Sequence, residues 1–127
     1  MAYGNFVLDK GYDLAAACEK FRVVKATSNA EEVTKVSAAT DYPLGVIQFG
    51  VITSELTRGK GASVREQGIS EVAAGAAITK GVEVEIDANG RVITASGTAG
   101  RWVLGIALAA AGALDDYIPV MIARRKQ

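Results

Sequence analysis

The sequence alternates strictly between apolar and charged residues from Val82 to Asp87. This pattern predicts a β-strand with one face in the core and the other in solvent, so Glu83 and Glu85 are expected to face solvent. Asn89-Gly90 follows, and this dipeptide strongly favours a hairpin because both central residues of the turn need positive φ. Residues 92–95 then form the returning strand. The hairpin therefore predicts antiparallel β-structure in the second half of the chain.

Two further apolar segments predict strands near the end of the chain. Residues 102–108 are a continuous apolar run typical of a buried strand. Residues 117–123 form another strand, in which Pro119 indicates an edge or bulged position because proline has no N–H to donate. Fourteen glycines against two prolines indicate many tight turns, and only 6% of the residues are aromatic. The expected fold class is all-β with minor α content and a core of Val, Ile, Leu and Ala.

The length of 127 residues suits one compact domain. We expect a single β-barrel domain over residues 13–127. Residues 1–12 show no sustained period, so they are expected to form an N-terminal arm, with an edge strand as the open alternative.

The two halves of the chain resemble each other at a constant offset. Residues 15–47 align with residues 75–107 without a gap, and Tyr42 aligns with Trp102. Alanine-rich sequence inflates such matches, so duplication of residues 15–64 as residues 75–122 is one of two open interpretations. Two such halves would close on each other as a small barrel without exposed sheet edges. The identical positions are Ala16, Ala17, Lys20, Val24, Asn29, Thr34, Ala39, Leu44 and Gly45 with Ala76, Ala77, Lys80, Val84, Asn89, Thr94, Ala99, Leu104 and Gly105.

The charges balance, with 14 basic and 14 acidic residues, which is a poor electrostatic match for nucleic acid or an anionic membrane. Residues 1–20 lack the apolar segment of a signal peptide, and the longest apolar stretch, residues 102–114, is too short to span a bilayer. We therefore expect a soluble protein made in a reducing cytoplasm, with no nucleic-acid or membrane partner.

Groups suited to catalysis or metal binding are scarce. The chain has no histidine, which removes the commonest general base and most catalytic zinc sites. The single cysteine, Cys18, lies in an apolar segment and is expected to be buried and unreactive. Residues 58–63 lack the glycine spacing of a phosphate-binding loop, and Asp115-Asp116 is better explained by a turn than by a cation. We expect no catalytic, cofactor or metal site, and we expect Tyr42 and Trp102 in the core or at a subunit interface.

A succession of glycine-containing motifs runs through residues 5–123. The motifs are Pro43-Leu44-Gly45-Val46, Gly59 to Gly61 with Ala62-Ser63-Val64, Gly68 with Val72-Ala73, residues 74–84, Gly90-Arg91-Val92, residues 104–108 and residues 115–120. Their order and spacing resemble the capsid decoration proteins of tailed phages, also called cement or head-stabilising proteins. The resemblance implies a small β-barrel of the β-tulip-like type. The chain departs from the family pattern at residues 17–22, which lack the glycine found at Gly81.

The resemblance also implies a function. It implies a non-enzymatic virion protein, made in the bacterial host cytoplasm, that binds the outer surface of the expanded phage head and stabilises it against the pressure of packed DNA. The implied partners are the major capsid protein and further copies of the chain, in a homotrimer. In related proteins the N-terminal arm often reaches the coat protein, which implies a capsid contact at Ala2, Tyr3, Gly4, Asn5, Phe6 and Val7.

Two other interpretations stay open. One is a different phage structural barrel, such as a tail component or a fibre base. The other is a non-catalytic β-barrel binding module. A lipoyl or biotinyl carrier would expose a lysine at a hairpin tip, whereas the tip in this chain is Asn89-Gly90.

Overall fold

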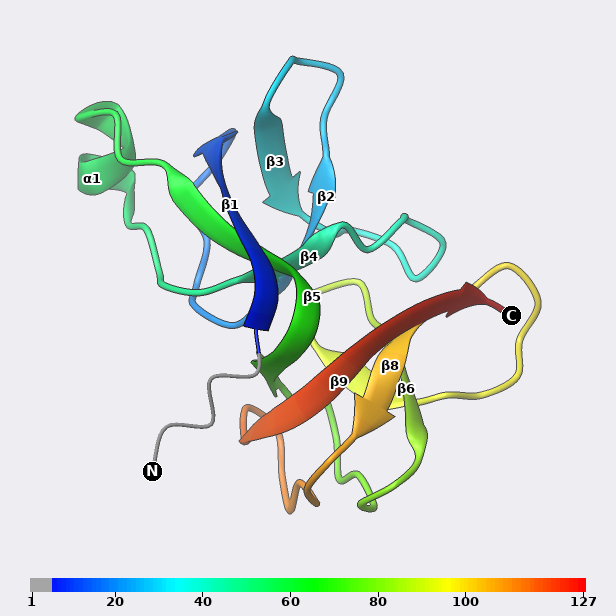
Figure 1. Cartoon of the computed structure of the whole chain (residues 1–127). Helices are drawn as coiled ribbons and strands as arrows, with labels where there is room; N and C mark the ends of the chain where they lie inside the picture. The colour runs from blue at the N-terminus through cyan, green and yellow to red at the C-terminus, as the bar shows by residue number, and fades with distance from the viewer. Residues whose placement is uncertain (1–5) are drawn as a thin grey trace.

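The computed structural model describes residues 6–127, which form nine strands and one short helix (Figure 1). The helix α1 (Thr53–Thr57) lies between β4 and β5, and none of the described helices is long and apolar enough to cross a membrane. The prediction of an all-β chain with a minor helical part is confirmed. The strands are β1 (Phe6–Leu14), β2 (Val23–Ala26), β3 (Glu32–Lys35), β4 (Gly45–Ile47), β5 (Ala62–Ala73), β6 (Glu83–Ile86), β7 (Val92–Thr94), β8 (Trp102–Ala107) and β9 (Tyr117–Lys126).

The first five strands close into a small barrel. β1 pairs with β3 on one side and with β5 on the other, and β3, β2, β4 and β5 pair in that order. Every pairing is antiparallel except that of β1 with β3. Closure gives each of these strands two neighbours, so the barrel leaves no long free edge.

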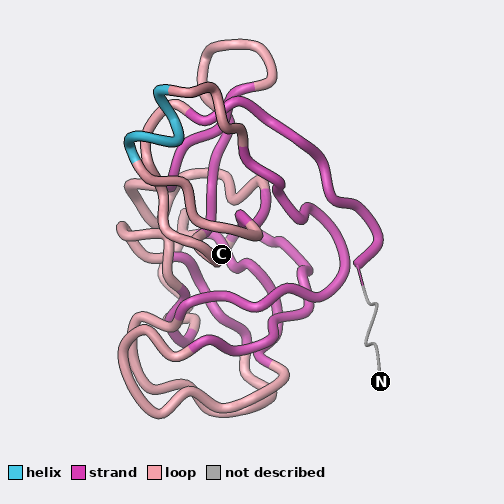
Figure 2. Tube along the Cα trace, turned by 90° about the vertical axis from the view of Figure 1, so that its left-hand side faces the viewer, coloured by secondary structure: helices cyan, strands magenta, loops and turns pink. Residues whose placement is uncertain are grey.

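The long strand β5 belongs to two sheets. Residues 62–68 pair with β1 and residues 69–73 pair with β9. β9, β8, β6 and β7 follow in that order, and a single parallel bridge from Ala74 to Val92 brings the sheet back toward β5. We call β1–β4 with residues 62–68 the first unit, and residues 69–73 with β6–β9 the second unit. Figure 1 shows β5 passing from one unit to the other, and Figure 2 shows most loops gathered on one side of the molecule.

The two units repeat the same order of strand pairings, and several contacts keep the offset seen in the sequence. The first unit begins at β1 and the second unit begins at residue 69. Each unit therefore starts before the corresponding repeat expected from the sequence, residues 15–64 or residues 75–122. The corresponding contacts are Val24 opposite Gly45 and Val84 opposite Gly105, with the isolated bridges Cys18 to Val51 and Ile78 to Ala111.

The same offset accounts for an unusual backbone conformation at Phe21. This residue has a φ of 57°, and Gly81, at the equivalent position, has a φ of 90°. Positive φ is costly for a residue with a side chain and free of strain for glycine. Phe21 is held in place by an edge-to-face contact with Tyr117, with ring centroids 5.2 Å apart. Phe21 therefore adopts the positive φ of the equivalent turn in the second unit, although it has a side chain where that turn has glycine.

Each unit has its own hydrophobic core. The first core contains Val24, Val33, Ile47 and Val64 inside the barrel. The second core surrounds Leu104, and it also includes Val23 and Val46 from the first unit. Because side chains alternate along a strand, Val23 and Val46 leave the outer side of the first barrel and pack against the second unit. This contact holds the two units together.

The strands β1 and β9 each have a neighbour on both sides. Residues 1–12 were expected to be an arm or an edge strand, and residues 6–12 are part of β1, which has a neighbour on each side. The prediction of an edge position for Pro119 is wrong, because β9 pairs with both β5 and β8. The Pro119 carbonyl oxygen accepts the Leu108 N–H just beyond the end of β8. The proline is tolerated because its nitrogen, which has no hydrogen to donate, lies beyond the last residue pair of β8 and β9, Ala107 with Val120.

Candidate interaction surface

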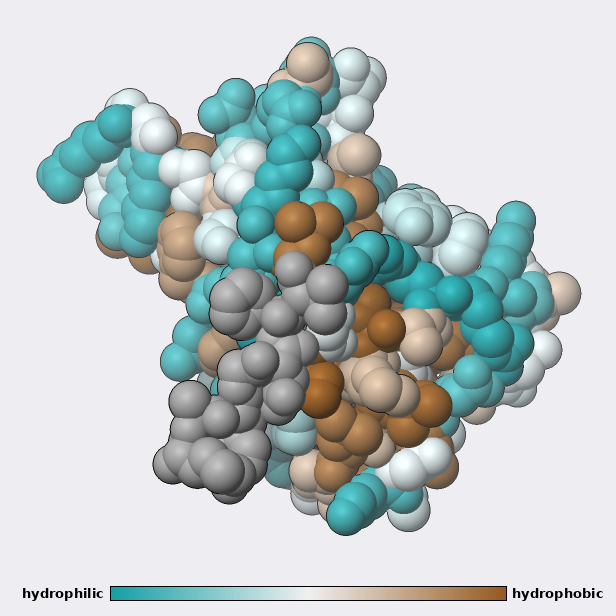
Figure 3. Space-filling view, in the orientation of Figure 1, coloured by the Kyte–Doolittle hydropathy of each residue, from teal (hydrophilic) through white to brown (hydrophobic). Residues whose placement is uncertain are grey.

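An apolar strip crosses the outer face of the second unit. Ile69 on β5 lies opposite Met121 on β9, and Met121 lies opposite Ile106 on β8. Pro119 and Leu108 form the next row, joined by a main-chain hydrogen bond of 2.9 Å. We call these five residues the apolar strip. Met121 is 41% exposed and the other four are half-buried, and Figure 3 shows the apolar surface gathered over β8 and β9.

Acidic residues border the strip. Glu83 lies opposite Ile106 and accepts hydrogen bonds from Arg125 at 2.6 and 2.7 Å, which lower the pKa of the Glu83 carboxyl. Glu71 lies opposite Pro119 and is exposed. Its carboxylate has no hydrogen-bond or ion-pair partner among residues 6–127. The strip therefore has an unpaired negative charge at its β5 side.

The equivalent position in the first unit is polar. Asp9 on β1 lies opposite Arg65 on β5, as Ile69 lies opposite Met121 in the second unit. Arg65 and Met121 correspond because each also lies opposite the equivalent residue of the next strand, Val46 or Ile106. The Arg65 guanidinium donates two hydrogen bonds to the Asp9 carboxylate, at 2.8 and 3.0 Å. The two outer faces thus share a backbone arrangement and differ in chemistry.

A second apolar feature projects from the far end of the first unit, next to α1. Phe49 is 37% exposed and Ile52 is 63% exposed, and we call these two residues the apolar tip. Lys60 lies over the Phe49 ring, 4.9 Å from its centroid, and binds Glu55 at 2.9 Å. Glu55 in turn accepts the Ile52 N–H at 3.1 Å. This chain of contacts fixes the tip relative to the helix.

An unpaired cation lies at the other end of the same helix. Arg58 follows the last residue of α1, and its main-chain N–H donates to the Glu55 carbonyl oxygen. Its side chain is exposed and has no hydrogen-bond or ion-pair partner within the described part of the chain. The helix α1 therefore has exposed apolar surface where it begins and, among the described residues, an unpaired positive charge where it ends.

Tyr42 and Trp102, predicted in the core or at a subunit interface, lie against each other within one chain. Their ring centroids are 4.9 Å apart at an interplanar angle of 86°. The main-chain N–H of Trp102 donates to the Ala39 carbonyl oxygen, so the pair joins the two units. Tyr42 is exposed and Trp102 is half-buried, and a contact of either residue with another subunit stays a prediction.

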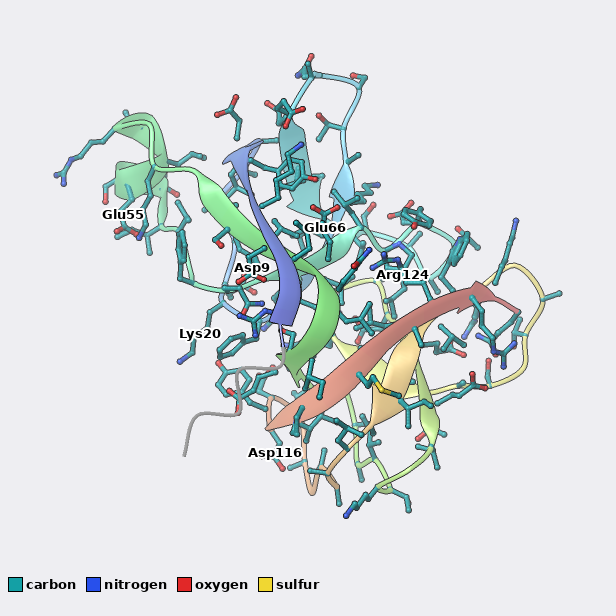
Figure 4. All side chains as sticks on the ribbon, in the orientation of Figure 1. Asp9, Lys20, Glu55, Glu66, Asp116 and Arg124 are labelled. Atoms are coloured by element: carbon teal, nitrogen blue, oxygen red, sulfur yellow. The ribbon has the colours of Figure 1, made fainter. Side chains whose placement is uncertain are left out.

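Arg124 binds β9 to the first unit. Its guanidinium donates to the Glu66 carbonyl oxygen at 2.8 Å and to the Leu44 carbonyl oxygen at 3.2 Å. It also lies 5.8 Å from the centroid of the Tyr42 ring. Figure 4 shows Arg124 near the first unit, with Glu66 close by. These bonds fix the strand that carries Met121 relative to the rest of the molecule.

The prediction that Glu85 faces solvent is wrong, because its side chain is fully buried. The Ser96 N–H and hydroxyl donate to it at 2.7 and 2.8 Å, and Arg101 donates at 3.0 Å. Burial by itself raises the pKa of a carboxyl group, but these bonds and one from Gln127 outweigh it and hold the pKa of Glu85 below its ordinary value. The loop after β7 therefore covers the face of β6 that the alternation assigned to water.

Cys18 is buried, as expected, and burial raises the pKa of its thiol to about 11. A thiol with this pKa stays protonated near neutral pH. Asp115 and Asp116 lie in a turn, where Asp115 binds Arg91 at 2.7 Å. Over residues 6–127 no group of three or more His, Cys, Asp or Glu side chains is placed to hold a metal ion.

The proposed capsid contact falls largely outside the described residues. Ala2, Tyr3, Gly4 and Asn5 lie outside them, and Phe6 and Val7 begin β1. Phe6 lies opposite Gly68, next to Ile69 of the apolar strip. A capsid contact at residues 2–7 stays a prediction.

The apolar strip was not found from the sequence, although β9 carries a signal for it. Tyr117, Pro119 and Met121 alternate with Ile118 and Val120, so both faces of this strand are apolar. A strand that is apolar on both faces is typically covered on both faces. In this chain one of those faces remains exposed at Met121.

Residues 19–122 match the family described as phage cement protein. No curated protein matches the chain. The fold is similar to the head fibre gp8.5 N base of bacteriophage phi29, with a TM-score of 0.72 and 16% sequence identity. The likeness covers 94% of this chain and 97% of that chain, and at this identity it is a likeness of fold.

Proposed function

This chain belongs to the phage cement protein family, and from that membership we propose that it binds the outer surface of the expanded phage head as a homotrimer and stabilises the shell. The family is one of structural, capsid-associated phage proteins, which agrees with a non-enzymatic role. The proposed partner is the major capsid protein. The load that the protein would resist is the outward pressure of the packed DNA.

The apolar strip is the observation that supports this proposal best. A clamp across the boundary between coat subunits needs contact area and a rigid body, not reactive groups. The strip supplies an apolar face on a strand that Arg124 fixes to the first unit. Contiguous exposed apolar surface on a small protein is typical of a protein-binding face.

The experiment uses expanded heads of the cognate phage that lack this protein. Purified chain is mixed with expanded heads or with unexpanded precursor heads, and bound protein is measured by pelleting. We expect binding to expanded heads, little binding to precursor heads, and a higher temperature of DNA release after binding. A wild-type chain that does not pellet with expanded heads would contradict the proposal.

Deletion of residues 2–5 tests the predicted contact of the N-terminal arm. The deletion leaves β1 intact because this strand begins at Phe6. We expect weaker pelleting with expanded heads and an unchanged unfolding midpoint. Equal pelleting of the two proteins would exclude these four residues as a capsid contact while leaving the proposed function in place.

A further inference from the structure

We propose that the apolar strip of one copy binds the apolar tip of the next copy, so that copies of the chain join head to tail. The inference rests on the proposed function for the use of such an assembly, and it names the surfaces that make it. The contact would pair Ile69, Met121 and Ile106 of one copy with Phe49 and Ile52 of the other.

Packing among the described residues leaves the strip partly exposed. In the first unit, the outer residues Val23 and Val46 are fully buried against the second unit. The equivalent residues of the second unit are Glu83 and Ile106, which are only half-buried. The second unit thus covers the part of this face formed by Val23 and Val46, and no third unit within residues 6–127 covers the equivalent part of the second unit. Another copy of the chain can supply that cover.

One copy cannot cover its own strip with its own tip. Figure 1 shows α1 at one end of the molecule and β8 in the other unit, away from it. Two different surfaces on one chain that bind each other form a heterologous contact, and such a contact closes into a ring when its rotation allows. A three-fold ring of this kind satisfies the proposed homotrimer.

Opposite charges lie near the two surfaces. Glu71 borders the strip and Arg58 follows α1, the helix that begins next to Ile52 of the tip, and neither side chain has a hydrogen-bond or ion-pair partner among residues 6–127. When the strip of one copy receives the tip of the next, these opposite charges approach each other. Complementary charges at the rim of an apolar contact set its orientation and its partner. The occupant that meets both requirements is a second copy of this chain.

The experiment measures self-association of the purified chain by sedimentation over a series of concentrations, without phage heads. We expect Glu71→Arg and Arg58→Glu each to weaken association by about tenfold. The double variant restores the opposite charges in exchanged positions, and we expect it to recover most of the loss. Met121→Asp should abolish association because it places a charge in the middle of the strip.

Matched controls carry the same charge reversals elsewhere. Asp13 and Lys126 are exposed, and their side chains have no ion-pair partner among the described residues. Asp13→Arg and Lys126→Glu should leave association unchanged. Single reversals no stronger than these controls, or a double variant that recovers nothing, would overturn the inference.

A zero-length cross-link tests the same contact on the phage head. In an Arg58→Lys variant, a carbodiimide can join the new amine to the Glu71 carboxylate of the next copy, and peptide mass spectrometry identifies the link. A wild-type chain that stays monomeric in solution, together with no such link on expanded heads, would overturn the inference. So would stronger association after deletion of residues 1–5, because that segment would then be the occupant of the strip.

The outcomes separate this inference from the proposed function. Charge-dependent association of a chain that never pellets with expanded heads would leave the inference standing and contradict the proposed function. Pelleting that is unaffected by any variant, with no Glu71 cross-link, would leave the function standing and overturn the inference. Pelleting that Met121→Asp abolishes in a monomeric chain would assign the strip to the coat protein and overturn the inference as well.

Discussion

The outer face of the first unit carries a salt bridge between Asp9 and Arg65, whereas the same register in the second unit places Ile69 beside Met121. The strand pairings that fix these positions are the same in both units. A repeated backbone therefore determines which side chains are neighbours, while the side chains determine whether the face meets water or a partner. The polar pair suits a surface in contact with water, and the apolar pair suits a surface covered by another protein, as we propose for the strip.

A second comparison concerns an ion pair whose signs are exchanged between the units. Lys25 binds Asp41 at 2.9 Å, and at the equivalent positions of the second unit Glu85 binds Arg101 at 3.0 Å. Each pair holds the loop that follows the hairpin of its unit. Attraction between opposite charges is kept when both signs are reversed, so the two units keep the contact with different residues. Burial differs, because Glu85 is fully buried and Lys25 is partly exposed.

The largest expected effect comes from Gly45 and Gly105, which occupy equivalent positions. A Cβ at Gly105 would overlap the Met121 carbonyl group, and a Cβ at Gly45 would overlap the Arg65 carbonyl oxygen. We expect Gly105→Ala and Gly45→Ala each to lower the free energy of unfolding by about 3 kcal/mol or more, measured by denaturant unfolding. Gly11→Ala is the control, since the atom nearest to its new Cβ would be the Ala62 carbonyl oxygen at 4.0 Å. Equal unfolding free energies of all three variants would show that the neighbouring strands can move apart to accept a Cβ without loss of stability.

Removing the buried charge of the second unit should have the next largest effect. Glu85→Gln should lower the free energy of unfolding by about 2 kcal/mol near neutral pH, because the Arg101 and Ser96 donors lose an anionic acceptor. Asp41→Asn, the matched change in the first unit, should cost about 1 kcal/mol or less because that pair is partly solvated.

The pH dependence of this difference has a definite sign. The folded-state pKa of Glu85 lies below its ordinary value of 4.5, so the carboxylate stabilises the folded protein above that value. The contribution is lost as the pH falls through the folded-state pKa. We therefore expect the difference between wild type and Glu85→Gln to shrink in denaturant titrations below about pH 4.5. A difference that stays constant into acid would contradict the role of the ionised carboxylate.

The turn at Phe21 and Gly81 should show an intermediate effect. Gly81→Ala adds a side chain at positive φ in open space, which should cost about 1 kcal/mol of unfolding free energy. Phe21→Gly and Phe21→Ala both lose the ring contact with Tyr117, but only glycine relieves the backbone strain. The glycine variant should therefore unfold at a higher denaturant concentration than the alanine variant. The reverse order would show that the conformation at position 21 is not strained.

The smallest expected effect is that of the salt bridge on the outer face of the first unit. Arg65→Met removes the bonds to Asp9 and one to the Ile69 carbonyl oxygen, and it should cost about 1 kcal/mol or less because the pair is partly exposed. Thermal unfolding of this variant beside Met121→Leu compares the two outer faces directly. A loss of several kcal/mol of unfolding free energy would mean that the Asp9–Arg65 salt bridge is needed for stability and does not serve only to keep this face polar.

Most of the strands could be predicted from local sequence because their signals are local. The hairpin at Asn89-Gly90 and the strand at Trp102 depend on turn geometry and on apolar runs, and both are present in the structure. The burial of Glu85 could not be predicted from the alternation, because the groups that cover it, Ser96 and Gln127, lie outside the strand itself. The apolar strip was missed for a related reason, since its members come from three different strands.

The sequence by itself determined the β class, the constant offset between the two similar halves, the burial of Cys18 and the lack of histidine chemistry. These features depend on residue type and on spacing along the chain. Only the tertiary structure decided that β5 serves both units, that Tyr42 meets Trp102 within one chain, and that Met121 stands between Ile69 and Ile106 on an uncovered face. The reason is physical: strand register and the packing of one unit on the other are long-range contacts, and alternation along one strand does not specify which face another segment will cover.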